Sequence, residues 1–254
     1  LDNIENYSIK ISELLKNINA CENGKIFIYT PKIKGDYAGT NFLQIILEHY
    51  GYSRKTIIRE KLTIENSYNI NLNPKSPNFK GYYMIAPAVD NFDTYIENFN
   101  KNINNYGEEI KIIIGTTNMF EGVSLSNIRQ IHILEPWYNL NRTKQTIGRA
   151  VRNLSHCMLP FKERNVEIFL YGTQLSEEND AESIDLYMYR LAEQKAMKIN
   201  TISRILKENA LDRFESPSVL PKNPLIPALD PANPDRKNWL PCENAATDWS
   251  PNWS

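Results

Sequence analysis

The sequence predicts an α/β fold in which a mainly parallel sheet is covered by helices on both faces. Short apolar runs, such as KIFIY at residues 25–29 and KIII at residues 111–114, have the length and the branched residues of buried strands. Amphipathic segments with apolar residues at helical spacing lie between these runs. Alternation of buried strands with amphipathic helices is typical of parallel sheets with both faces covered.

The first part of the chain begins this alternation. Residues 4–18 place Ile, Leu and Tyr at helical spacing, and residues 25–29 then suit a buried strand. A helix predicted over residues 40–51 ends at Gly51, a residue that commonly terminates helices. Residues 53–80 are polar and rich in asparagine, so we predict an irregular insertion there.

The middle of the chain continues the pattern. Residues 81–87, 111–116 and 129–136 are apolar runs that predict strands, and residues 91–100 place aromatic side chains on one side of a helix. A basic helix is expected over residues 143–153.

The last part of the chain changes character. A strand is expected at residues 166–173, followed by a long helix over residues 183–209 with a broken apolar stripe, typical of a helix that packs on a core or docks on a partner. From Glu215 onward prolines and tryptophans accumulate, and prolines exclude a regular helix or a central strand. We therefore predict an extended tail.

Length and composition limit the class of protein. The chain has 254 residues, 41% of them hydrophobic, and a formal net charge of −1, which allows a sizeable core and argues against a strongly cationic coat. No apolar run approaches the length of a membrane span, so we expect no membrane partner. The expected organisation is a domain of residues 1–180, a helical extension of residues 181–212 and the tail of residues 213–254. Because the chain begins with Leu1 rather than Met, we expect a fragment of a longer polypeptide.

The cysteines indicate the redox environment. Cys21, Cys157 and Cys242 are widely separated and lack a C-x-x-C spacing. This argues for a reducing intracellular compartment and against a disulfide framework or structural zinc. We expect no metal site on this chain, and we expect His156, beside Cys157, to be an ordinary packing residue.

Two arginines stand three apart in TKQTIGRAVRN, residues 143–153. Residues at this spacing are neighbours on a helix, so we expect Arg149 and Arg152 on one face, with Gln145 one turn upstream. Two interpretations are open: a solvated face with acidic neighbours, or a pair of guanidiniums aimed at a polyphosphate. Gly148 would let a ligand approach this helix closely.

A second unusual segment is GTTNMFEGVSL, residues 115–125, which follows a predicted strand. Ligands of open α/β sheets bind beyond the carboxyl ends of the strands. Gly115, Thr116 and Thr117 at the strand exit let backbone amides approach a phosphate chain, and Glu121 and Gly122 follow in the same loop.

The stretch IIIGTTNMFEGVSLSNIRQIHILEPWYNLNRTKQTIGRAVR resembles the C-terminal RecA-like lobe of superfamily 2 helicases and translocases. GTTNMFEGVSL lies where motif V would, QTIGRAVR fits the Q-x-x-G-R-x-x-R form of motif VI, and GKIFIYT is similar to the strand that carries motif IV. IRQIHILEPWYN, RNLSHCMLPFKERNVEIFLY and SIDLYMYRLAEQKAMKINTISRILKENALD are similar to helicases of large nucleocytoplasmic DNA viruses, including the small subunit of the poxvirus-type early transcription factor. The resemblance covers roughly residues 10–212.

The resemblance implies an ATP site between two RecA-like lobes. Arg152 would be the arginine finger, Arg149 a second phosphate or interdomain contact, and Gln145 a sensor of the nucleotide beside Gly148. The Mg²⁺ that accompanies ATP would be held by an N-terminal lobe that is absent from this chain.

The resemblance also implies a nucleic-acid groove. Gly115, Thr116 and Thr117 would contact the nucleic-acid backbone, while Glu121 and Gly122 would link the groove to the nucleotide. We expect DNA in preference to RNA, and we expect a viral RNA polymerase or transcription-factor subunit as a further partner. A viral protein of this kind would occur in the virion and the host cytoplasm.

The sequence has no G-x-x-x-x-G-K-[ST] phosphate loop and no D-E-x-H motif, so this chain alone is expected not to hydrolyse ATP. The leading expectation is the C-terminal half of an ATP-dependent nucleic-acid helicase or translocase, viral and linked to transcription. The alternative is a non-catalytic helicase-like scaffold that docks on a polymerase or a transcription factor. A nucleoside-phosphate transferase is a third, weaker reading.

Overall fold

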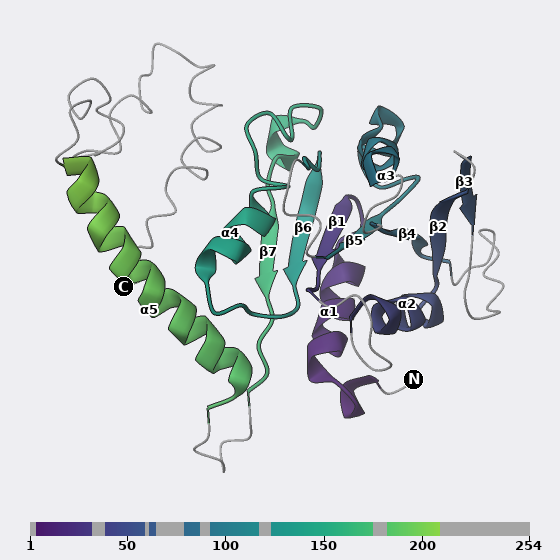
Figure 1. Ribbon diagram of the computed structural model, residues 1–254. Helices are drawn as coiled ribbons and strands as arrows, with labels where there is room; N and C mark the ends of the chain where they lie inside the picture. Colours follow the sequence, from purple (N-terminus) through teal and green to yellow (C-terminus); the bar gives the residue numbers. More distant parts are fainter. Residues whose placement is uncertain are drawn as a thin grey trace.

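A seven-stranded sheet forms the centre of the molecule. The structure, a computed structural model, describes residues 4–31, 39–58, 61–64, 79–86, 92–116, 123–174 and 182–208. Within these residues the strand order is β3-β2-β4-β5-β1-β6-β7 (Figure 1). Neighbouring strands are parallel except for β2 and β3, which form an antiparallel pair at one edge. The predicted fold class, a mainly parallel α/β sheet, is confirmed.

The strands differ in burial according to their place in the sheet. Their bounds are β1 (Lys25–Tyr29), β2 (Tyr52–Ile58), β3 (Lys61–Ile64), β4 (Gly81–Ile85), β5 (Ile112–Gly115), β6 (Ile128–Ile133) and β7 (Glu167–Leu170). Strand β1 lies between β5 and β6, and all five of its residues are buried. Strand β7 is at the opposite edge from β3 and is only partly buried.

Helices cover both faces of the sheet. Their bounds are α1 (Ile9–Ala20), α2 (Gly39–His49), α3 (Phe92–Asn100), α4 (Leu140–Ile147) and α5 (Ile184–Glu208), with short 3-10 helices η1 (Ile4–Asn6), η2 (Asn102–Asn104) and η4 (Phe161–Glu163). Helix α1 begins after Ser8, whose hydroxyl accepts a hydrogen bond from the Ile11 amide at 3.3 Å. This cap satisfies one of the amides that a helix start leaves without an intrahelical partner.

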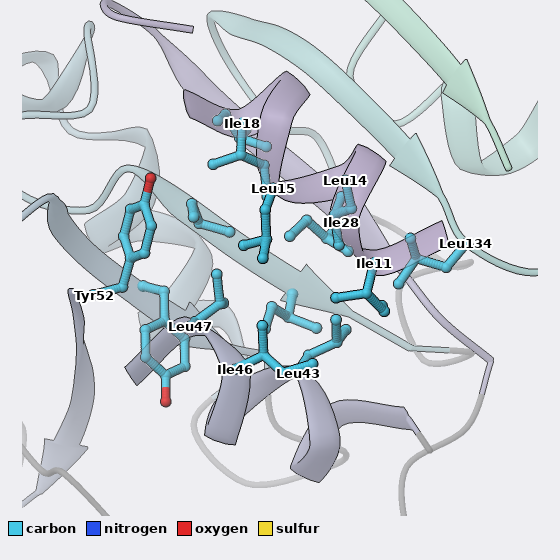
Figure 2. Close-up of a cluster of buried hydrophobic side chains, with 14 of the residues drawn as sticks. Ile11, Leu14, Leu15, Ile18, Ile28, Leu43, Ile46, Leu47, Tyr52 and Leu134 are labelled. Atoms are coloured by element: carbon cyan, nitrogen blue, oxygen red, sulfur yellow. The ribbon is translucent and has the colours of Figure 1, made fainter. Parts of the chain in front are cut away.

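The apolar core is divided by the sheet into two clusters. On β1, Ile26 and Ile28 point into the cluster formed with α1 and α2, which Figure 2 shows in close-up. Phe27 and Tyr29 point to the other face, where α3 and α4 contribute to the second cluster. This alternation follows from the two-residue period of a strand.

Strands β2 and β3 lie at the start of the segment predicted as irregular, so that part of the prediction was wrong. The sequence did not reveal β2 because several of its residues are polar. In the structure these polar residues are buried and paired. Lys55 forms an ion pair with Glu109 at 3.0 Å, and the hydroxyl groups of Thr56 and Tyr95 are 2.6 Å apart. Residues 59–60 and 65–78 lie outside the described residues.

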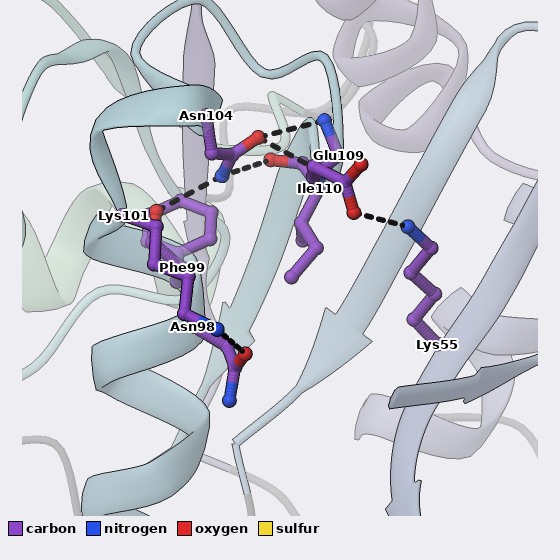
Figure 3. A network of polar contacts seen from close by, with 7 residues as sticks. All are labelled: Lys55, Asn98, Phe99, Lys101, Asn104, Glu109 and Ile110. Carbon is purple, nitrogen blue, oxygen red and sulfur yellow. Dashed lines mark hydrogen bonds and ion pairs between the residues drawn. The ribbon is translucent and has the colours of Figure 1, made fainter. Parts of the chain in front are cut away.

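A buried asparagine organises the turn between α3 and β5. The Asn104 amide donates to the carbonyl oxygens of Phe99 and Ile110 at 2.9 and 3.1 Å, and its oxygen accepts from the amides of Glu109 and Ile110, both at 2.9 Å (Figure 3). All four bonds join side chain to backbone. One side chain therefore fixes both ends of the turn.

Lys25 is a buried amine at the start of β1. Its Nζ donates to the Phe99 carbonyl at 3.0 Å and lies 4.6 Å from the centre of the Phe99 ring. Burial lowers the pKa of Lys25 to about 7, and the charge of Glu108 opposes this shift only in part.

A chain of polar side chains lies on the α1 face of the sheet, along β6 and β7. The Asn17 amide donates to the Tyr171 hydroxyl at 3.0 Å, and this hydroxyl lies 2.8 Å from Nδ1 of buried His132. His132 Nε2 lies 3.2 Å from Gln130 Oε1, and the Gln130 amide donates to Glu167 at 3.0 Å. The contacts are satisfied together when Nε2 carries the proton of a neutral imidazole. Burial lowers the pKa of His132 to about 3.

Helix α5 agrees with the long helix predicted over residues 183–209. Its first turns are attached to the body, because Asp185 accepts from Lys10 Nζ at 2.5 Å and from the Thr173 amide at 3.0 Å. The Tyr189 hydroxyl donates to the Tyr171 carbonyl at 3.1 Å. In Figure 1, α5 lies at the side of the molecule, beyond α4. Among the described residues, no helix combines the length and apolar character needed to span a membrane.

Candidate functional site

The candidate site lies where the segment leading into β6 meets the chain that follows α4. The Leu125 amide donates to the Arg149 carbonyl at 2.8 Å, and the Asn127 amide donates to the Ser155 carbonyl at 2.9 Å. Leu125 is fully buried in the cluster beneath α3 and α4. These contacts hold residues 123–127, which include the last residues of the motif V-like stretch, against the motif VI-like stretch and the residues that follow it.

Helix α4 begins and ends earlier in the chain than the helix predicted over residues 143–153. It begins at Leu140 because the Asn139 side chain caps it, accepting from the Asn141 amide at 3.1 Å. It ends at Ile147, before Gly148, a residue that weakens helix continuation. Hydrogen-bonded turns follow, with the Val151 amide donating to the Ile147 carbonyl at 2.9 Å.

The two arginines therefore lie in the turns after α4 and do not present one shared open face. Arg152 is exposed, whereas Arg149 is half-buried and is tied to Leu125 through its carbonyl. The expectation that both arginines lie on a helix was wrong, because α4 ends before both of them. Gln145 is exposed on α4.

The guanidinium of Arg152 is held from two sides. Its Nε donates to the Gly148 carbonyl at 2.9 Å, and a terminal nitrogen donates to the Ser124 hydroxyl at 2.5 Å. The Arg152 amide donates to the Ser155 hydroxyl at 3.2 Å. The side-chain contacts use two of the five guanidinium N–H groups, so an oriented edge of the guanidinium remains for an anion. Sequence reasoning identified Arg152 and Gly148 but missed Ser124.

Backbone geometry reinforces this arrangement. Asn127 and Leu154 both have positive φ angles, 57° and 62°, in a region that residues other than glycine seldom adopt. Asn127 donates the hydrogen bond to the Ser155 carbonyl, and Leu154 directly precedes Ser155. Such conformations persist where surrounding contacts over-determine them.

Gly115 and Thr116 lie in a different place, at the carboxyl edge of the sheet. The Gly115 carbonyl accepts from the Thr30 amide at 3.1 Å, which joins the exits of β5 and β1. Thr116 follows Gly115 and is buried, with 3% of its surface exposed. In this structure the Thr116 side chain is therefore inside the edge rather than on its surface. Thr117, Glu121 and Gly122 lie outside the described residues.

A cavity of about 160 Å³ opens at this carboxyl edge. It is lined by Ser8, Lys10, Ile11, Thr30, Gly39, Phe42, Leu43, Leu134 and Glu135. The Thr30 hydroxyl is buried and has no hydrogen-bond partner among the described residues. Sequence reasoning did not find this cavity, because its lining comes from α1, α2 and the exits of β1 and β6.

The loop between β6 and α4 carries stacked aromatic rings. Trp137 and Tyr138 stack with their centroids 4.6 Å apart, and the Arg142 guanidinium lies 4.0 Å from the centre of a Trp137 ring. Lys195 of α5 donates to the Tyr138 carbonyl at 3.4 Å. Aromatic and cationic groups of this kind are suited to stacking on bases and pairing with phosphates.

The described residues contain no group of three or more His, Cys, Asp or Glu side chains placed to hold a metal ion. His156 is a packing residue, since Nε2 lies 2.7 Å from the Ile128 carbonyl and Nδ1 lies 2.8 Å from the Ser155 hydroxyl. Burial lowers its pKa. Cys21 and Cys157 are free thiols, and Cys242 lies outside the described part of the chain.

Comparison with known proteins places these observations in a family. Residues 90–154 match the helicase conserved C-terminal domain. "Putative helicase 087L" of Invertebrate iridescent virus 3 is 32% identical over 216 residues, covering 83% of this chain and 20% of that protein. Nucleoside triphosphatase I of Melanoplus sanguinipes entomopoxvirus is 29% identical over 222 residues, covering 85% of this chain and 28% of that protein.

Among solved structures, the chain is similar to the C-terminal part of the Fun30 ATPase domain. The identity is 18% and the TM-score 0.45, with 73% of this chain and 45% of that chain covered. This chain spans less than a third of the length of each of the two viral relatives described above. Residues 90–154 thus match a helicase conserved C-terminal domain, and most of the chain is similar to part of a putative helicase and a nucleoside triphosphatase of large DNA viruses.

Proposed function

We propose that this chain is the C-terminal RecA-like lobe of an ATP-dependent nucleic-acid helicase or translocase, with Arg152 as its arginine finger. The supporting observation is the exposed Arg152 guanidinium, oriented by the Ser124 hydroxyl and the Gly148 carbonyl with donors to spare. A guanidinium fixed in this way can stabilise negative charge on a phosphoryl group without reorganising during the reaction.

The residues present fit a bound triphosphate. ATP supplies the phosphoanhydride bond whose hydrolysis drives movement along nucleic acid. Arg152 would bind and orient the terminal phosphate, and Arg149 and Gln145 would contact the nucleotide or the other lobe beside Gly148. We propose that the carboxylates for Mg²⁺ lie on an N-terminal lobe.

The nucleic-acid groove is proposed along the carboxyl edge of the sheet. Gly115, with Thr116 and Thr117 beside it, would approach the sugar-phosphate backbone through main-chain amides, since the Thr116 side chain is buried. Glu121 and Gly122 would connect this edge to Ser124 and thereby to Arg152. We propose DNA rather than RNA as the substrate.

The relatives support a viral setting. We propose that the protein serves transcription in the virion and the host cytoplasm, with a viral RNA polymerase or transcription-factor subunit as partner. The competing function is a helicase-like scaffold without catalysis, which is favoured by one observation, the exposed apolar side chains of α5.

Measurement of nucleic-acid-stimulated ATPase activity in the full-length polypeptide distinguishes the helicase from the scaffold. Arg152→Ala should lower kcat by roughly 10³-fold with a smaller change in nucleotide affinity, and Arg152→Lys should restore little because an ammonium lacks the planar fork. Arg190→Ala, which removes an exposed arginine of α5 that forms an ion pair with Glu182, is the matched control and should keep full turnover.

Thermal melting of each variant completes the experiment. Near-normal turnover of Arg152→Ala would refute the arginine finger. Loss of turnover together with a large fall in melting temperature would show that Arg152 is structural. A wild-type polypeptide without any ATPase activity would support the scaffold.

A further inference from the structure

Helix α5 carries large apolar side chains that the other described residues leave exposed. Ile202 is 60% exposed and Leu206 is 67% exposed, and other members of the set are also open to solvent. On one side of α5 the set comprises Ile184, Tyr187, Ile199, Ile202, Ile205 and Leu206, and Leu186 and Met197 are exposed on the opposite side. A helix that only closed the core would bury such residues, so these exposed positions require another explanation.

Most of these exposed residues lie along one side of the helix. Successive residues turn by about 100°, so Ile184, Leu191 and Ile202, spaced seven and eleven apart, project in nearly the same direction. The side that packs on the body is different, because Ala192 is buried and Tyr189 bonds to the Tyr171 carbonyl. The apolar stripe therefore runs beside the attached side and continues along the second half of α5.

The same stripe is basic. Lys195 and Lys198 are its polar members, and residues 194–206 contain no Asp or Glu. Lys195 contacts the Tyr138 carbonyl and lies 5.2 Å from the Tyr138 ring centre, at the border with the loop before α4. Lys198, by contrast, is exposed on the open half of the stripe.

We propose that the second half of α5 is a docking surface for an amphipathic helix of a partner protein whose apolar stripe is flanked by acidic side chains. The aliphatic residues would pack between the ridges of the partner helix, and Lys198 would pair with its carboxylates. This complementarity sets the specificity of the contact, because a basic partner would face like charges.

Two other occupants fit the surface less well. An antiparallel second copy paired over the middle of the stripe would bring the lysines of both copies together. A nucleic acid would pair with the lysines but would leave Ile199, Ile202 and Leu206 without an apolar partner. The acidic helix satisfies both kinds of group at once.

The test uses the 254-residue chain and two synthetic helical peptides of about 21 residues, with identical leucine stripes flanked either by glutamates or by lysines. Fluorescence anisotropy should show binding of the acidic peptide at micromolar concentration and at least tenfold weaker binding of the basic one. Ile202→Glu should weaken acidic-peptide binding by about tenfold or more. Lys198→Glu should reduce the preference for the acidic peptide.

Met197→Glu is the matched control, because Met197 is 61% exposed but projects from the opposite side of α5. This variant should bind the acidic peptide as the wild type does, and circular dichroism melting should show that all variants are folded. Absence of peptide binding, equal binding of both peptides, or equal effects of Ile202→Glu and Met197→Glu would overturn the proposal. A dimer by light scattering that Ile202→Glu dissociates would instead assign the surface to a second copy. DNA binding lost specifically in Ile202→Glu would assign it to nucleic acid.

Discussion

The hydroxyl of Ser124 lies 2.5 Å from a terminal guanidinium nitrogen of Arg152. The backbone around Ser124 is held by the Asn100 side chain. The Asn100 amide donates to the Ser124 carbonyl at 2.8 Å, and the Asn100 side-chain oxygen accepts from the Ser126 amide at 2.9 Å. The end of α3, residues 123–127 and Arg152 therefore form one continuous set of hydrogen bonds. A displacement of the loop before Val123 would reach Arg152 through Ser124.

Replacing Ser124 by alanine in the full-length polypeptide should lower kcat for ATP about tenfold and leave KM nearly unchanged, because one orienting contact of Arg152 is lost. Ser124→Thr keeps the hydroxyl and should retain most of the turnover. Ser126→Ala, in the same segment, is the control. Since Ser124 is exposed, the melting temperature of the Ser124→Ala protein should equal that of the wild type. Normal kcat in Ser124→Ala would show that Gly148 alone positions Arg152.

Asn104→Ala should destabilise the protein by about 3 kcal/mol or more, because several buried backbone groups lose a partner at a cost of about 1–3 kcal/mol each. Asn104→Asp should also destabilise it, since a carboxylate would face the carbonyl oxygens of Phe99 and Ile110. Urea unfolding measures both effects. The control is Asn102→Ala at an exposed position of η2. Equal midpoints for the Asn102 and Asn104 variants would contradict the role given to Asn104.

Lys25 should make stability rise with pH above neutrality. Its pKa is about 7 in the folded protein and about 10.4 when unfolded, so the unfolded state binds more protons between these values and folding is favoured as pH rises. The gain from this group approaches about 1.4 kcal/mol per pH unit within the window. Unfolding free energies of wild type and Lys25→Met, measured from pH 7 to 9, should diverge in favour of wild type. Parallel curves would mean that Lys25 remains charged in the folded state.

His132 should make the protein sensitive to acid. The folded protein protonates His132 only near pH 3, whereas the unfolded chain does so near pH 6.5. The unfolded state therefore binds more protons between these values, and stability falls as pH is lowered through the window. His132→Phe should show a shallower loss of stability from pH 6.5 to 4.5. Part of the slope should remain, because the pKa of buried His156 is lowered too. An unchanged slope would exclude His132 as its source.

The sequence predicted the parts of the fold that depend on apolar patterning. Strands β1, β4, β5, β6 and β7 are runs of branched and aromatic residues, and helix α5 shows its period over many turns. Strand β2 was missed because Arg54, Lys55 and Thr56 are polar, and only tertiary partners such as Glu109 and Tyr95 make their burial possible. The bounds of α4 were shifted because its start depends on the cap by Asn139.

The site was predicted only in part, for a similar reason. Motif spacing identified Arg152 and Gly148, but the contact with Ser124 joins residues 28 positions apart and has no local signal. Thr116 has a hydroxyl at a strand exit, yet its burial depends on neighbouring strands. Contacts between segments that are distant in sequence decide where a functional side chain points.

The position of β1 affects how the protein is made. This strand is synthesised before both of its neighbours, β5 and β6, which lie far later in the chain. Until they emerge from the ribosome, Phe27 and Ile28 belong to a strand with two open edges, a template for wrong pairing between nascent chains. Long-range pairing of this kind slows folding. Expression at reduced temperature, or together with chaperones, is therefore expected to raise the soluble yield of this protein more than a change in its surface would.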